Sequence, residues 1–252
     1  MQKMTMQEIG MTLTEFREWI SGKSIAVVGN SLGSLDRDQG EQIDSHDLTL
    51  RFGKGTPAPF NFEKIGTRTD LWVTGVLRAD RRKFLPPNTI TLWNNSLYDP
   101  QTQGPKCIEP LVDMFTREQI HYLGDEFGLP GNKRLSAGAI ASLWLTRVAY
   151  DWDSLTFYNF DCFTSHTAVY NHLAEENSIV SSWHLPLLKP GYSTMNWREG
   201  NPAHHSPTEV KVFKEVLKKT GTVWKSKPFT ENHEWLEGST VEWSSGRSPA
   251  RY

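Results

Sequence analysis

Two short turns of small residues are the clearest places where this sequence could bind an anion. The first, Gly29-Asn30-Ser31-Leu32-Gly33, follows the apolar run Ser24–Val28, which we interpret as a buried strand. Sheets of α/β proteins commonly bind ligands at the carboxyl ends of their strands, so the turn is a candidate nucleotide site. It lacks both the G-x-G-x-x-G spacing of dinucleotide-binding proteins and the Lys of a phosphate loop. Taken alone, an ordinary structural turn explains it slightly better.

The second turn, Ser136-Ala137-Gly138, precedes the strongest helical pattern of the chain. From Gly138 to Tyr150, Ala, Leu, Trp and Val follow one another without a helix breaker. The N–H groups at the start of such a helix would point at an anion, with the positive end of the helix dipole behind them. A simple Ser N-cap accounts for the same residues. Both interpretations stay open on local grounds.

The elements around these turns alternate between strand and helix. A leading helix is predicted within residues 1–22, where Thr12 and Glu15 have capping-box spacing and Phe16, Trp19 and Ile20 repeat at helical intervals. Further strands are predicted at Asp47–Phe52, Leu71–Val73, Thr89–Trp93 and Ser154–Phe160, and further helices at Ile108–Gln119, Thr167–Glu176 and Thr208–Thr220.

The remaining segments complete the predicted organisation. Gly53 to Arg68, rich in Gly and Pro, is predicted to be a loop over the sheet edge that lines the site, and residues 225–252 an irregular tail. The alternation favours one α/β domain over residues 1–252, with a Rossmann-like, mostly parallel sheet and helices on both faces.

Composition excludes several classes of function. Lys and Arg number 27 against 29 Asp and Glu, so the chain lacks the basic excess that nucleic-acid binding needs. The basic run from Arg78 to Lys83 is interpreted as a solvated face. Cys107 and Cys162 are far apart, which indicates neither a zinc site nor a disulfide framework. Because no signal-peptide core and no run of 18 apolar residues is present, we expect no membrane span and a cytoplasmic location.

The first turn lies in a segment that resembles a known sequence motif. Ser24 to Phe52, SIAVVGNSLGSLDRDQGEQIDSHDLTLRF, is similar to the large sialylmotif of eukaryotic-type sialyltransferases. The matching positions are Ala26, Val27, Val28, Gly29, Asn30, Ser31, Leu35, Gly40, Ile43, Asp44, His46, Asp47 and Arg51. We treat Asp44 and His46 among them as scaffold rather than as catalysts.

Two further segments resemble the same family. Leu135-Ser136-Ala137-Gly138, with its helix and Tyr158-Asn159-Phe160, resembles the small sialylmotif, in which P-S-S-G opens a helix that leads to a Y-G-F strand. His204 to Glu209 matches the very short motif, a His and a Glu separated by four residues. Order and approximate spacing agree from Ser24 to Glu209, so the resemblance spans most of the chain. Together with the missing targeting signal, it suggests a soluble microbial or viral-type member of the family.

The resemblance implies a fold like the glycosyltransferase A variant of sialyltransferases and a set of site residues. Asn30 and Ser31 would contact the nucleotide of a CMP-sugar donor. Ser136, Ala137 and Gly138 would cradle its ribose or phosphate. His204 would take the proton of the glycan acceptor, and Glu209 would support it or simply cap the following helix.

This assignment agrees with the chemistry of sugar transfer. A sugar hydroxyl is a weak nucleophile, and an imidazole is suited to remove its proton as the new bond forms. The helix start after Ser136 can stabilise the departing phosphate without a divalent ion. Asp151-Trp152-Asp153 resembles the D-x-D of metal-dependent glycosyltransferases, but we interpret it as a solvated loop. No metal and no resident cofactor are therefore expected.

The sequence departs from the family pattern at several points. The family usually joins its large and small motifs by a disulfide. The corresponding positions here are close to Ile25 and Ala149, so both cysteines are absent, and a reducing compartment permits that loss. Gly53 replaces an Asn that contacts the donor. Residues that could supply a missing contact or the third motif are Asn61, Asn94, Asn95, His184 and Asn196-Trp197-Arg198. His205 beside His204 leaves two candidates for the base.

The function predicted from the sequence is metal-independent, inverting transfer of sialic acid or a related 2-keto sugar acid from its CMP conjugate to a glycan hydroxyl. One alternative is a transferase that uses another nucleotide sugar, which the Gly at position 53 permits. Another is an inactive nucleotide- or glycan-binding module. A dinucleotide-dependent oxidoreductase is disfavoured by the spacing of the first turn.

Overall fold

The architecture was obtained as a computed structural model. It describes residues 10–30, 38–53, 57, 62–75, 77, 85–94, 110–131, 133–160, 204–220 and 223–224.

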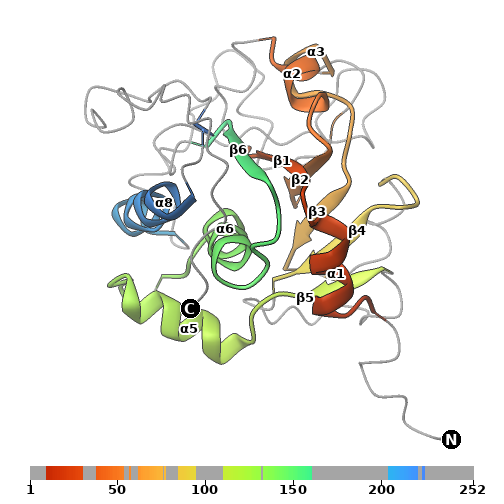
Figure 1. Cartoon of the computed structure of the whole chain (residues 1–252). Coiled ribbons are helices and arrows are strands. Elements are labelled where there is room, and N and C mark those ends of the chain that lie inside the picture. Colours follow the sequence, from red (N-terminus) through yellow and green to blue (C-terminus); the bar gives the residue numbers. More distant parts are fainter. Residues whose placement is uncertain are drawn as a thin grey trace, which may run out of the picture.

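One open sheet organises the described residues (Figure 1). Its strands are β1 (Ser24–Val28), β2 (Leu48–Phe52), β3 (Leu71–Thr74), β4 (Ile90–Trp93), β5 (Leu111–Asp113), β6 (Ser154–Tyr158) and β7 (Val223–Trp224). Their order is β5-β4-β3-β2-β1-β6-β7, and all neighbouring pairs are parallel. The predicted Rossmann-like α/β fold is confirmed.

The strand order places a topological switch point between β1 and β6. From β1 the chain adds strands outward to β5 on one side, and then returns to add β6 and β7 on the other side. Crossovers leave in opposite directions at such a point, and open α/β sheets commonly bind ligands at the carboxyl ends of the strands that flank it. The carboxyl ends of β1 and β6 are therefore the candidate location of a binding site.

The described helices cover both faces of the sheet. They are α1 (Leu13–Ile20), α2 (Gly40–Asp44), α3 (Phe62–Ile65), α5 (Arg117–Glu126), α6 (Ala137–Arg147) and α8 (Ser206–Thr220). Helix α6 lies between the sheet and helices α5 and α8 (Figure 1), so eight consecutive residues, 138–145, are buried. On the opposite face, Ile43 of α2 packs with Ala26, Val28 and Tyr158.

The main core lies on the face of the sheet that α6 covers, where α1, α5, α6 and α8 pack against the strands. Ile25 and Val27 of β1 contribute to it, and Trp144 of α6 lies fully buried against Phe16 of α1, with ring centroids 5.2 Å apart. Burial of large side chains on both sides of α6 fixes the helix relative to the sheet. Its first turn is therefore held rigidly at the carboxyl edge.

Caps and apolar runs in the sequence correctly predicted several helices and strands, including where they begin or end. The capping box of Thr12 and Glu15 opens α1, β1 spans its predicted residues, and Ser136 is the N-cap of α6. The helix predicted at Thr208–Thr220 is confirmed and begins slightly earlier, at Ser206. Capping and periodicity depend on neighbours within one or two turns, which a sequence records directly.

Other predictions were wrong. The single helix predicted at Ile108–Gln119 is instead β5 followed by α5, because Thr116 and Gln119 form a second capping box that starts the helix late. The segment Gly53 to Arg68, predicted as loop, contains α3, and the short elements α2 and β7 were not predicted.

Apolar and polar residues alternate along β2, yet all five of its residues are buried. Thr49 and Arg51 are fully buried, and the Arg51 guanidinium donates to the carbonyl oxygens of Arg68 and of Ile65, the last residue of α3. The predictions for residues 78–83, 167–176 and 225–252 lie outside the described residues. None of the described helices combines the length and apolar character needed to cross a membrane.

Candidate active site

The carboxyl ends of β1 and β6 meet in close backbone contact. The N–H of Gly29 donates to the carbonyl oxygen of Tyr158 over 2.8 Å, continuing the ladder one residue beyond β1. A Cβ atom on Gly29 would lie 2.5 Å from the carbonyl oxygen of Asn159. Only glycine permits this approach, so the first turn leaves the sheet directly beside the end of β6.

The ring of Phe160 joins the two small-residue turns. A Cβ atom on Gly138 would lie 2.7 Å from the ring, and one on Gly29 would lie 2.9 Å from it. The first turn of α6 and the turn after β1 thus face each other across one aromatic side chain. Phe52, at the end of β2, packs edge-on against the same ring at 5.6 Å. Gly29 and Gly138, which are about a hundred residues apart in sequence, thus contact the same ring and mark one candidate site.

Asn30 ties the first turn to the end of β2. Its Nδ2 donates to the carbonyl oxygen of Phe52 over 3.1 Å. No other described residue pairs with this side chain, so with respect to them its amide oxygen and second N–H are available to a ligand. The next residue, Gly53, has a φ of 53° and open space around its Cα. Gly53, which stands where the family pattern has an Asn, therefore borders the turn at Asn30 but has no side chain.

Ser136 makes both a helix cap and a long-range contact. Its Oγ accepts from the N–H of Ala139 over 3.0 Å, as an N-cap should. The same Oγ donates to Oε2 of Glu209 over 2.6 Å, and its own N–H donates to Oε1 over 2.8 Å. No described group pairs with the N–H of Ala137 or Gly138, so these donors at the positive end of α6 are available.

Glu209 is the buried carboxyl group of the site, with an exposed fraction of 1%. Burial raises its pKa to about 7, and the two hydrogen bonds from Ser136 act in the opposite direction. The group thus joins the start of α8 to the start of α6. The sequence suggested a supporting role or a plain cap for Glu209, and the structure gives it a contact 73 residues away.

His204 lies just before α8, against the segment that leads into α6. Its Nδ1 is 3.0 Å from the carbonyl oxygen of Arg134. Because a carbonyl oxygen only accepts, Nδ1 carries the proton, and in the neutral ring the lone pair is on Nε2. Burial lowers the pKa of His204 to about 4, helped by the charges of Arg134 and Lys133, although the carbonyl contact raises it. The imidazole is therefore neutral at physiological pH.

His205 has a different role in the local structure. Its Nδ1 is 2.8 Å from Oγ1 of Thr208, and its carbonyl oxygen accepts from the N–H groups of Thr208 and Glu209. These contacts make His205 part of the first turn of α8. The two adjacent imidazoles are thus distinguished by their partners.

The other residues predicted for the site are not all brought together. Asn94 follows β4, which is separated from β1 by β2 and β3. It therefore lies at the carboxyl edge of the sheet but roughly 14 Å from the end of β1, at normal strand spacing. Ser31, Asn61, Asn95, His184 and Asn196-Trp197-Arg198 lie outside the described residues. Sequence reasoning placed Asn159 in the small motif but did not single it out as a candidate site residue, and it missed the carbonyl group of Arg134, which has no local signal.

Asp151-Trp152-Asp153 lies at the opposite edge of the sheet. These residues precede β6, which runs for five residues before it reaches the site. Asp151 forms an ion pair with Arg17 of α1, and Trp152 is buried. The D-x-D-like segment therefore joins α1 to the sheet and cannot place its carboxylates at the carboxyl edge.

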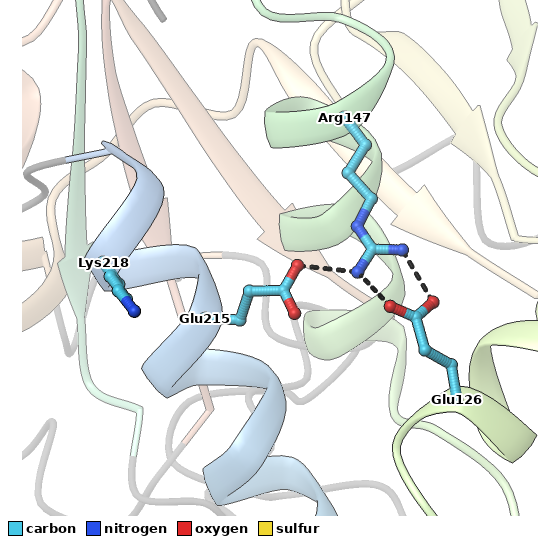
Figure 2. A pocket seen from close by; sticks show the side chains of 4 residues that line it. All are labelled: Glu126, Arg147, Glu215 and Lys218. Carbon is cyan, nitrogen blue, oxygen red and sulfur yellow. Dashed lines mark hydrogen bonds and ion pairs between the residues drawn. The ribbon is translucent and has the colours of Figure 1, made fainter. Parts of the chain in front are cut away.

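A surface hollow lies at the far end of α6, lined by Glu126, Arg147, Glu215 and Lys218 (Figure 2). The Arg147 guanidinium donates to Glu126 over 2.7 and 2.8 Å and to Glu215 over 2.6 Å. This network joins α5, α6 and α8. Because its only arginine is already paired with two carboxylates, we interpret the hollow as a structural contact.

Comparison with solved structures finds proteins with a similar fold. One mammalian sialyltransferase, solved in complex with Gal-beta-1-3GalNAc-ortho-nitrophenol, is 18% identical with a TM-score of 0.50, and the match covers 84% of this chain and 72% of that one. A second mammalian sialyltransferase structure is 16% identical with a TM-score of 0.48, covering 85% and 78%. No protein-family model and no curated protein sequence matches. The chain has a sialyltransferase-like fold.

Proposed function

We propose that this chain is an inverting, metal-independent glycosyltransferase that moves sialic acid or a related 2-keto sugar acid from its CMP conjugate to a glycan hydroxyl. The observation that supports this most is that Gly29 after β1 and Gly138 at the start of α6 contact the same ring, that of Phe160, at the switch point. Among the described residues, the N–H groups of Ala137 and Gly138 have no partner, and His204 bonds to the carbonyl oxygen of Arg134, two residues before the Ser136 cap.

In the proposed reaction each of these groups has one task. Nε2 of His204 accepts the proton of the acceptor hydroxyl as its oxygen forms a bond to the anomeric carbon. Attack from the face opposite the donor phosphate inverts the configuration. The bond from the anomeric carbon to the phosphate oxygen breaks, and its electron pair leaves with CMP. The N–H groups of Ala137 and Gly138 stabilise the phosphate charge.

The choice of His204 over His205 follows from their partners. The Arg134 carbonyl holds His204 in the tautomer whose Nε2 can accept a proton. His205 instead interacts with Thr208 at the start of α8. With a pKa of about 4, His204 is unprotonated through the neutral range, so its lone pair is present to accept the proton, although the same shift makes it a weaker base than an ordinary imidazole.

Paired alanine variants test this assignment. His204→Ala should lower kcat for transfer by about a hundredfold or more, while CMP affinity stays close to wild type. His205→Ala is the matched control and should keep most of its turnover. The acid limb of kcat/KM should fall near pH 4 rather than 6.5. Unchanged turnover in His204→Ala would remove that residue from the mechanism.

Metal independence has its own test. We expect transfer to continue at the same rate in excess chelator, because α6 supplies the charge stabilisation. Loss of activity that added Mg²⁺ or Mn²⁺ restores would contradict this part of the proposal.

Two alternatives are separated by simple assays. Calorimetry with CMP, UMP and GMP distinguishes a CMP-sugar enzyme from one that uses another nucleotide sugar. An inactive binding module would bind nucleotide yet show neither transfer nor slow hydrolysis of the donor in the absence of acceptor. A cytoplasmic location and a microbial or viral origin stay predictions of the sequence.

A further inference from the structure

Asn159 has an unusual combination of backbone and side chain. It is the only described non-glycine residue with a positive φ, 59°, and its exposed fraction is 4%. Among the described residues, its amide nitrogen finds no hydrogen-bond partner. Buried amides are almost always paired in folded proteins, so an unpaired one calls for a reason.

Backbone conformation explains only half of this observation. Asn adopts positive φ more readily than other residues with a side chain, but Gly does so at no steric cost. The turn would therefore form equally well without an amide. Burying an unpaired amide is unfavourable, and the geometry of the turn provides no compensation.

The position of Asn159 supplies the compensation. It follows β6 at the switch point, and its carbonyl oxygen lies against Gly29 of the first turn. Phe160, the next residue, contacts Gly138 of α6. Asn159 thus borders the turn after β1 and directly precedes the ring that contacts the start of α6, so an oxygen acceptor bound beside these turns could pair with its amide.

We propose that Asn159 is a specificity-determining residue whose side-chain amide donates a hydrogen bond to an oxygen of the bound nucleotide. This inference rests on the function proposed above and deepens it. The family pattern that the sequence resembles has Gly at this position, so the contact would be one that this chain adds. A phosphate, a ribose hydroxyl and a base carbonyl are all oxygen acceptors, and the test separates the phosphate from the nucleoside.

The experiment compares wild type with Asn159→Gly, which keeps the positive φ and removes the amide. Calorimetry with CMP should give a Kd about tenfold weaker for the variant, which is about 1.4 kcal/mol. The Tm without ligand should stay within about 3 °C of wild type, since Gly fits the turn. Asn159→Asp keeps the side-chain shape and exchanges the donor for a charged acceptor, so it should weaken CMP binding at least as much.

Cytidine distinguishes the two kinds of acceptor. Weakening of CMP but not cytidine binding assigns the contact to phosphate, and equal weakening of both assigns it to the nucleoside; either result supports the inference. A Kd for CMP within twofold of wild type in both variants overturns it and leaves the proposed function intact. If wild type binds none of CMP, UMP and GMP, the proposed function fails, and this inference fails with it.

Discussion

Replacing Glu209 with Gln removes a buried carboxyl group while keeping its shape. In the folded protein the pKa of Glu209 is about 7, above the ordinary value of 4.5, because burial disfavours the charged form. The folded state therefore holds this proton more tightly than the unfolded chain does. Its stabilising contribution is fully present below about pH 4.5 and is lost as pH rises through 7.

The size of the effect follows from the same pKa values. A rise from 4.5 to about 7 corresponds to about 3 kcal/mol of folding free energy. Gln cannot ionise, so the free energy of unfolding of Glu209→Gln minus that of wild type should increase by up to that amount between about pH 4.5 and 8.5. The lowered pKa of His204 acts in the opposite direction, but it is present in both proteins and cancels from the difference.

Urea unfolding followed by tryptophan fluorescence measures this difference directly, because the chain has 10 tryptophans. Unfolding free energies would be determined at five pH values for both proteins. Glu41→Gln, at an exposed position of α2, is the matched control. A difference that changes by less than about 0.5 kcal/mol over the whole range would refute the reasoning that burial keeps Glu209 protonated.

Two further predictions concern the edge of the site and the far end of α6. Gly53→Asn should fold, because Asn tolerates the φ of 53° and the Cβ position is open. The variant should bind CMP about three- to tenfold more tightly in calorimetry. Unchanged affinity would mean that this position does not face the donor. Arg147→Met should lower the free energy of unfolding by about 1–2 kcal/mol, less in 1 M NaCl, by leaving Glu126 and Glu215 without their shared partner. Its CMP affinity should equal that of wild type, and a weakened affinity would contradict the structural interpretation of this network.

Short-range patterns made a large part of the fold predictable. The capping box at Thr12, the apolar run of β1 and the Ser136 cap are complete within a few residues, and the structure has each of them. The second capping box, at Thr116 and Gln119, was equally local but was hidden inside a segment that looks helical from Ile108 onward. The apolar pattern of that segment led to the prediction of one long helix, although Thr116 and Gln119 mark a later start.

Burial of polar residues was not predictable in the same way. The alternation in β2 is consistent with one solvated face, yet Arg51 is fully buried and donates to the carbonyl oxygens of Ile65 and Arg68. Which segment covers a sheet face depends on a contact between residues that are distant in the chain. Periodicity within one strand contains no information about that contact.

The sequence by itself determined the residue types at the site, the two small-residue turns and the order of elements that builds a parallel sheet. Only the tertiary structure decided that Ser136 would bond to Glu209, that the Arg134 carbonyl would set the tautomer of His204, and that Asn159 would be buried beside Gly29. The reason is physical. Conformational preference is set by near neighbours along the chain, whereas pKa values, tautomers and burial are set by neighbours in space.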